Sequence, residues 1–188
     1  MIYARLTYNT NNWESPSRPY GKSKNEKVHE FEFSFGFEEW LRNPNHYLTT
    51  INQEEYCYGY IEGIHKNYIN GDENRPLILF TINAVTKERF IVGEIKEWKF
   101  VNSKESRDIV LQNQNRIEQM RNDVVIVSEN MQEAIEKFDQ HVNNENGLQL
   151  FNIKYKEMHY SYDENHPLQN NHPIYKLHRF WLHRNIQN

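Results

Sequence analysis

The sequence predicts an α+β fold in which short, mostly antiparallel strands close into a small barrel with a few helices packed around it. Three observations favour this class. Several short segments alternate apolar and polar residues, one pair of apolar runs has the spacing of a β-hairpin, and helical periodicity is concentrated late in the chain. Because 188 residues is the length of one domain, we expect a single domain over residues 1–188.

The composition indicates a folded protein with an acidic balance. Lysine and arginine number 22 against 26 acidic residues, which gives a net charge of −4, and 14% of the residues are aromatic. Disordered chains are poor in such rings. The single cysteine, Cys57, excludes an internal disulfide and zinc sites made of several thiolates. No window reaches the roughly 18 apolar residues that span a bilayer, and no signal peptide is apparent, so we expect a cytoplasmic protein without membrane contact.

The first quarter of the chain predicts a strand, a loop and a short helix. Residues 2–8 alternate with period two, which is typical of a strand. Residues 13–27 contain two prolines and no periodicity, so they form a loop, and loops of this length are usually functional or disordered. The phenylalanines of residues 31–35 alternate as in a second strand, and the i, i+3, i+4 spacing in residues 37–41 predicts a short helix that ends before Pro44.

Strands dominate the middle of the chain. Residues 55–65 predict a strand with three tyrosines on one face, namely Tyr56, Tyr58 and Tyr60. A turn is expected over residues 66–76. The apolar runs at residues 77–82 and 89–95 have the spacing of a hairpin, and the second run continues to Phe100.

The last part of the chain predicts a helical pair followed by two strands. Ser106 and Ser128 can each cap a helix, so the pair occupies about residues 106–142 as an insertion before the last strands. Apolar residues recur along one face of each helix; they are Ile109, Val110, Ile117 and Met120 in the first and Met131, Ala134, Ile135, Phe138 and Val142 in the second. Residues 150–155 and 175–182 then read as strands.

The aromatic residues suggest where chemistry could take place. Tyr and Trp combine a flat stacking face with a polar atom, which suits a site that holds a planar heterocycle. The candidates are Trp13, Phe37, Trp40 and the tyrosine face of Tyr56, Tyr58 and Tyr60. Each ring taken alone has an equally direct interpretation as core packing, because rings mostly bury apolar area.

Cations gather in two places in this acidic chain. Arg18, Lys22, Lys24 and Lys27 lie in the first loop, and Lys176 and Arg179 lie near the end with histidines beside them. Basic loops next to aromatic residues are typical of a rim that contacts nucleic-acid phosphates. Because the net charge is −4, such contacts have to be confined to one face of the protein.

Five segments resemble, in order, a known family. They are Asn11-Asn12-Trp13 with Pro16-Ser17, Gly36-Phe37-Glu38-Glu39-Trp40-Leu41, Tyr58-Gly59-Tyr60-Ile61-Glu62-Gly63-Ile64, Val92-Gly93-Glu94-Ile95-Lys96 and Phe151-Asn152-Ile153-Lys154-Tyr155. Together they resemble the N-terminal recognition domains of bacterial modification-dependent restriction endonucleases, which are similar to the EVE, YTH and ASCH branch of the PUA-like superfamily. The resemblance runs over most of the chain.

The resemblance implies a twisted PUA-like barrel that flips a modified base out of double-stranded DNA into an aromatic cage. The base would be methylated or hydroxymethylated cytosine, or methyladenine. Carried over to this chain, the cage consists of Trp13, Phe37, Trp40, Tyr58 and Tyr60, with Ser15, Ser17 and Asn83 as groups that read the base edge. We expect a reader without catalytic residues, metal or cofactor, which works with a nuclease domain or subunit.

Other functions stay open at this point. Glu94 and Lys96 match a Glu-x-Lys element, and with Asp72 they could hold magnesium for phosphodiester cleavage. The histidines near the end, His159, His166, His172, His178 and His183, have irregular spacing, which argues against zinc. A reader of modified RNA, or a protein-interaction module that uses the helical pair, would also fit the sequence.

Overall fold

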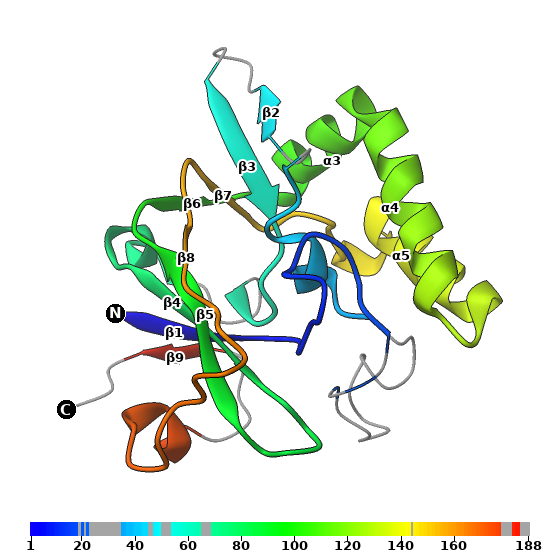
Figure 1. Ribbon diagram of the computed structural model, residues 1–188. Helices are drawn as coiled ribbons and strands as arrows, with labels where there is room; N and C mark the ends of the chain where they lie inside the picture. Colours follow the sequence, from blue (N-terminus) through cyan, green and yellow to red (C-terminus); the bar gives the residue numbers. More distant parts are fainter. Residues whose placement is uncertain are drawn as a thin grey trace.

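Figure 1 shows the computed structural model, in which the described residues form two β-sheets, three α-helices and several 3₁₀ helices. The structure describes residues 1–18, 20, 22, 35–44, 47–49, 54–64, 69–143, 145–177 and 182–184. The helices lie together beside β3 (Glu55–Gly59), away from β1 (Ile2–Leu6) and β9 (Leu182–Arg184). The predicted α+β class is therefore confirmed.

The first sheet has five strands in the order β8-β5-β4-β1-β9. Three of them were expected from the sequence, β1 from its alternation and the two strands of the hairpin from their apolar runs, whereas the strand predicted over residues 175–182 overlaps β9 at Leu182 alone. Strand β1 pairs in parallel with β4 (Leu77–Ile82), whereas β4 and β5 (Arg89–Ile95) form the predicted antiparallel hairpin. Strand β8 (His159–Tyr160) pairs antiparallel with β5, and β9 pairs antiparallel with β1.

The second sheet has four antiparallel strands in the order β2-β3-β7-β6. They are β2 (Tyr47–Thr49), β3, β7 (Ile153–Tyr155) and β6 (Trp98–Phe100). Only residues 96 and 97 separate β5 from β6, so one nearly continuous segment passes from the first sheet to the second. The strands of the described residues thus form two sheets, and the pairings give no closed barrel among these residues.

The helical insertion contains three helices where the sequence predicted two. They are α3 (Ser103–Gln112), α4 (Gln114–Val127) and α5 (Met131–Val142). The expected caps were wrong. The Asn102 side chain accepts from the Glu105 amide at the start of α3, and the Asn130 side chain accepts from the Glu133 amide at the start of α5, while Ser128 lies at the end of α4. Asparagine caps helices as well as serine, because both side chains accept from a free amide.

Two large apolar clusters stabilise this arrangement. One lies between the helices and the second sheet and includes Phe35, Phe138 and Phe151, which are at most 2% exposed. The other lies between the two sheets and includes Ile2, Leu79 and Trp98. Most of the predicted inward positions of the helices, such as Ile117 and Phe138, are buried, which confirms the helical periodicity in those parts.

Several predicted boundaries were wrong or lie outside the described residues. The helix expected over residues 37–41 is a 3₁₀ helix, η1 (Phe37–Trp40). Residues 173–176, where a strand was expected to begin, form another 3₁₀ helix, η5 (Pro173–Lys176), which starts with proline. Shorter 3₁₀ helices are η3 (Asp72–Asn74) and η4 (Glu145–Gly147). Of the strand expected over residues 31–35, only Phe35 lies within the described residues.

A search of the described helices finds none that is both long and apolar enough to span a bilayer.

Candidate functional site

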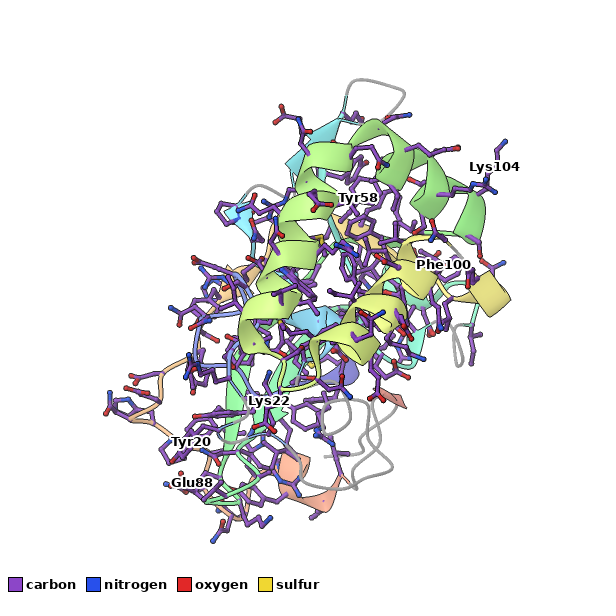
Figure 2. All side chains as sticks on the ribbon, turned by 90° about the vertical axis from the view of Figure 1, so that its right-hand side faces the viewer. Tyr20, Lys22, Tyr58, Glu88, Phe100 and Lys104 are labelled. Atoms are coloured by element: carbon purple, nitrogen blue, oxygen red, sulfur yellow. The ribbon has the colours of Figure 1, made fainter. Side chains whose placement is uncertain are left out.

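The five rings of the predicted cage lie in the interior. Trp13 and Tyr58 are 0% exposed and Trp40 is 1% exposed, and Phe37 and Tyr60 are also buried. Trp13 belongs to the cluster between the sheets, whereas the other four belong to the cluster beneath the helices. Figure 2 looks onto the side of the molecule on which the three helices lie, and Tyr58 is labelled there behind the helices. The prediction of one five-ring cage is therefore wrong.

Contacts with the helices explain why these rings are buried. The Phe37 ring stacks on the ring of His141 from α5 with 3.8 Å between centroids. The indole of Trp40 donates to Asp123 Oδ2 of α4 at 2.9 Å. Alternation along the sequence identified a common face but not what covers it, and here three helices cover it.

A buried ion pair accounts for two other predicted site residues. Lys22 Nζ lies 2.6 Å from Glu39 Oε1, and their side chains are 1% and 0% exposed. The other oxygen of Glu39 accepts from the side chain of Asn9 at 2.7 Å and from the backbone amide of Ser17 at 2.9 Å. Lys22 and Ser17 are thus internal anchors of the first loop, and the assignments to phosphate and base contacts were wrong for them.

The remaining predicted residues are scattered. Ser15 and Arg18 line a shallow hollow of about 390 Å³ against α4. The side chain of Asn83 is buried and accepts from the amides of Val85 and Thr86, so it shapes the β4–β5 turn instead of facing a ligand, which corrects its predicted role. Lys176 is exposed in η5. Lys24, Lys27 and Arg179 lie outside the described residues.

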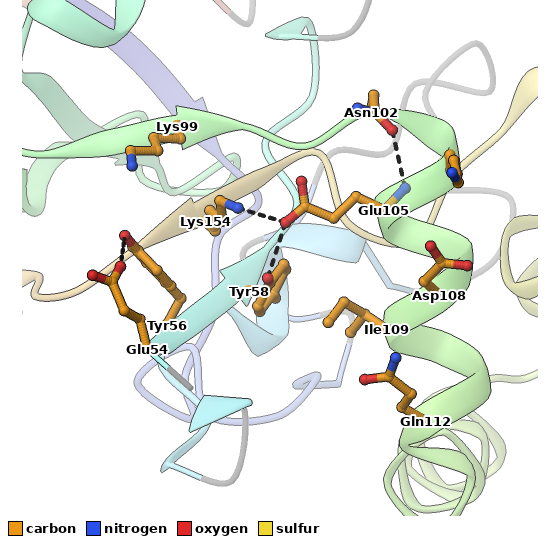
Figure 3. Close-up of a pocket in the computed structure, with 11 residues that line it drawn as sticks. Glu54, Tyr56, Tyr58, Lys99, Asn102, Glu105, Asp108, Ile109, Gln112 and Lys154 are labelled. Atoms are coloured by element: carbon orange, nitrogen blue, oxygen red, sulfur yellow. Dashed lines mark hydrogen bonds and ion pairs between the residues drawn. The ribbon is translucent and has the colours of Figure 1, made fainter. Parts of the chain in front are cut away.

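The strongest candidate site is a hollow of about 430 Å³ between α3 and the second sheet. Figure 3 shows its construction: strands β3, β7 and β6 supply the floor, and α3 supplies one wall. The lining residues are Glu54, Tyr56, Tyr58, Lys99, Asn102, Lys104, Glu105, Asp108, Ile109, Gln112 and Lys154. The volume lies within the range of small-ligand pockets.

Three residues that are paired across neighbouring strands place two positive charges on the floor of the hollow. Tyr58 of β3 is opposite Lys154 of β7, which is opposite Lys99 of β6. Like charges directly opposite each other destabilise a sheet. Glu105 of α3 offsets this for one lysine, because its Oε1 lies 2.6 Å from Lys154 Nζ and accepts from the Tyr58 hydroxyl at 3.0 Å (Figure 3). Burial and the Glu105 carboxylate raise the pKa of Tyr58, so its hydroxyl stays protonated.

Three lysines surround the neighbouring ring of Tyr56. The ammonium groups of Lys99, Lys154 and Lys156 lie 5.8, 5.3 and 5.4 Å from the ring centroid. The Tyr56 hydroxyl donates to Glu54 at 2.7 Å. This hydrogen bond and the nearby lysines, Lys156 foremost, lower the pKa of Glu54, while the bond to Glu54 raises the pKa of Tyr56. The site therefore combines an aromatic ring with several cations on an acidic protein.

The α3 wall adds a carboxylate and a side-chain amide, with an apolar side chain beside them. Asp108 is half-buried and Gln112 is exposed, and the buried side chain of Ile109 lies between them in the wall. Sequence reasoning identified Tyr58 as part of a site but missed these residues and the lysines. The available signal was the period-two spacing of Lys154 in β7 and Lys156 just after it, because this spacing places both side chains on one face of an extended chain.

The residues of the nuclease hypothesis do not form one site. Glu94 and Lys96 line a hollow of about 390 Å³ with Glu97, Lys156, Glu157 and His159, and Asp72 is not among its lining residues. Asp72 is buried, accepts from the Ile69 amide and pairs with Arg75 at 3.6 Å. No group of three or more His, Cys, Asp or Glu residues suited to a metal ion is found in the described ranges.

Two of the late histidines have local roles. His166 Nδ1 lies 2.6 Å from Asp163 Oδ2, and the His172 ring caps η5 by accepting from the Ile174 amide.

Comparison with known proteins adds no relative: no family model, no curated protein and no solved structure matches this chain.

Proposed function

We propose that the chain is a nucleic-acid-binding module that takes one extruded, modified base into the hollow between α3 and the second sheet. The observation that carries this proposal is the combination in one hollow of the Tyr56 ring, the lysines around it and the hydrogen-bonding side chains of α3. Proteins that bind unpaired nucleotides use the same elements, namely aromatic stacking platforms and cations for the backbone.

Stacking on Tyr56 requires that a base take the place of a lysine. Tyr56 is only 7% exposed, because the lysine side chains lie over its ring. An exposed cation–π contact contributes about 0.5–1 kcal/mol, whereas stacking of a base contributes about 1–3 kcal/mol. The exchange is therefore favourable, and the displaced ammonium group can bind the phosphate of the same nucleotide.

Residues of α3 supply recognition of the base edge. A carboxylate accepts from the exocyclic amino group of cytosine, and a glutamine amide can bind adenine. Asp108 and Gln112 offer these two groups along the wall, and the side chain of Ile109 offers apolar contact for an added methyl group. Burial of one methyl group contributes on the order of 1 kcal/mol, so a methylated cytosine is the base that this wall fits best.

The family resemblance supports the same proposal. The resemblance implies a small twisted barrel; the described strands form two sheets that are joined by the segment from β5 to β6, and their pairings do not close a barrel, so the resemblance supports the proposal through its motifs. In this proposal the site has moved from the predicted cage to the α3 hollow. As in the family, cleavage would be performed by a separate nuclease domain or subunit.

The test is a binding screen by fluorescence anisotropy. Labelled DNA duplexes that carry methylcytosine, hydroxymethylcytosine, methyladenine or no modification are compared with matching RNA. We expect the methylcytosine duplex to bind most tightly, and Asp108→Asn to weaken its binding roughly 5- to 100-fold, as for the loss of one base-specific contact.

The matched control is Glu118→Gln, which removes a carboxylate from the exposed surface of α4. Both variants make the protein less negative, which by itself strengthens attraction to phosphates. A contact between the Asp108 carboxylate and the amino group of the base predicts weaker binding by Asp108→Asn, whereas the loss of negative charge alone predicts tighter binding. Binding by Asp108→Asn that equals or exceeds that of the parent protein, or a parent that binds none of the nucleic acids, would contradict the proposal.

A further inference from the structure

A second hollow adjoins the candidate site. It has a volume of about 410 Å³ and shares four lining residues with the first, namely Glu54, Tyr56, Lys99 and Lys154. Lys104 lines only the first of the two, and Lys156 lines the second but not the first. Tyr56 and the two shared lysines therefore form the boundary between two hollows of similar size.

The charges at this boundary match a single bridging anion. Lys99 and Lys154 are directly opposite each other on β6 and β7. Glu105 lies 2.6 Å from Lys154, whereas Lys99 lies over the Tyr56 ring, 5.8 Å from its centroid, and acts on the carboxylate of Glu54 through its charge. Repulsion between the two opposite ammonium groups is thus only partly offset, and an anion between them would offset the rest.

The second hollow also has the chemistry of a base subsite. Trp98 is among its lining residues, although only 3% of it is exposed and it packs in the cluster between the sheets, and Glu73 and Glu97 supply carboxylates. The carboxylates disfavour a phosphate inside this hollow and suit the exocyclic amino groups of bases. Phosphate is therefore favoured at the shared lysines, and bases are favoured on either side.

We infer that the site takes two consecutive nucleotides. One base enters the hollow beside α3, the next enters the hollow beside Trp98, and the phosphate that links them lies against Lys99 and Lys154. This inference rests on the proposed function and adds the number of nucleotides bound and their path across Tyr56.

The experiment compares two ligands on the same protein by competition against a labelled oligonucleotide. The first ligand is the 5′-monophosphate of methyldeoxycytidine. The second is the same nucleotide joined to one further nucleotide through a phosphodiester. We expect the dinucleotide to bind at least tenfold more tightly to the parent protein. Lys156→Gln should weaken the dinucleotide more than the mononucleotide and so reduce this gain, because Lys156 lines only the second of the two hollows, whereas Lys104→Gln should weaken both ligands by the same factor.

Lys104→Gln and Lys156→Gln remove the same charge from exposed positions, so each is the control for the other. Equal affinities for the two ligands, or a gain that Lys156→Gln leaves intact, would overturn the two-nucleotide inference while the proposed function stands. Failure of the parent protein to bind either ligand would overturn both.

Discussion

A single carboxylate organises the first loop of this protein. Glu39 lies in η1, and its oxygens accept from Asn9, Ser17, Lys22 and the Gly36 amide. The charged pair with Lys22 is fully removed from water. A buried charge keeps its stabilising role only while its partners are in place. Glu39 thus holds the first loop to η1, and hydrogen bonds from Arg42 and Asn43, which lie shortly after η1, add to this attachment.

Removal of this carboxylate should be costly. We predict that Glu39→Gln lowers the free energy of unfolding by about 3–5 kcal/mol, because Lys22 would be left as an uncompensated buried charge. Lys22→Met should cost less, since the donors from Asn9, Ser17 and Gly36 would still serve Glu39. Urea titrations of the three proteins measure both differences.

The control is an ion pair on the surface. Arg121 and Asp139 lie 3.1 Å apart, but their side chains are 35% and 39% exposed. Asp139→Asn should change stability by less than about 1 kcal/mol, as is usual for exposed pairs. Similar losses for Glu39→Gln and Asp139→Asn would show that the buried pair has no special role.

Individual residues were the hardest level to predict from the sequence. Lys22 resembles any other loop cation, and its partner Glu39 is 17 positions away. Trp40 was expected in a short helix and Tyr58 on the tyrosine face of a strand, but the residues that cover these two rings come from helices more than 40 positions later. A sequence pattern gives the spacing of side chains and no information on which distant element packs on them.

Secondary-structure elements were predicted better, and the β4–β5 hairpin shows why. Its alternation and its turn are local properties, so the sequence contains the whole signal. The helical insertion was predicted in place, but as two helices. The first predicted helix is divided at Asn113, where α3 ends and α4 begins, and the sequence pattern did not show this break.

The cap of α3 matters for the site as well as for stability. The Asn102 side chain accepts from the Glu105 amide at 3.0 Å, and both residues line the hollow. We predict that Asn102→Ala costs about 0.5–2 kcal/mol of stability and weakens ligand binding, because the first turn of α3 carries Glu105. Thermal unfolding and the anisotropy assay measure the two effects.

Asn122→Ala is the matched control, because Asn122 is an exposed asparagine within α4. Alanine has the higher helix propensity, so this change should be neutral or slightly stabilising. Equal effects of the two substitutions would contradict a capping role for Asn102.

At the scale of the whole molecule, the hollow arises where three distant segments meet. Strand β3, strand β7 and helix α3 are separated in the chain, and their side chains converge because the insertion of residues 103–142 packs against the second sheet. The sequence predicted the insertion and the tyrosine strand, but it could not predict their contact. The net charge of −4 describes the whole chain, so it gave no sign that lysines from separate segments come together around Tyr56 in the folded protein.

The fold should also lose stability in alkaline solution. Burial raises the pKa of the Cys57 thiol to about 11, and burial also raises the pKa values of Tyr58 and Tyr60. In the unfolded chain a thiol ionises near pH 8.5. Above that pH the unfolded state releases a proton that the folded state retains up to about pH 11, so the free energy of unfolding falls as the pH rises through this window.

Urea titrations at pH 8 and pH 10 measure this loss. Between pH 8 and pH 10 the raised pKa of Cys57 should lower the free energy of unfolding by about 1–2 kcal/mol. The tyrosines should lower it further at higher pH. Cys57→Ala leaves a small cavity and should be less stable at pH 8, but its decrease between pH 8 and pH 10 should be smaller than that of the parent protein. Equal decreases in the two proteins would mean that the Cys57 thiol ionises as readily in the folded state as in the unfolded one, contrary to its position between Leu41 and Tyr155.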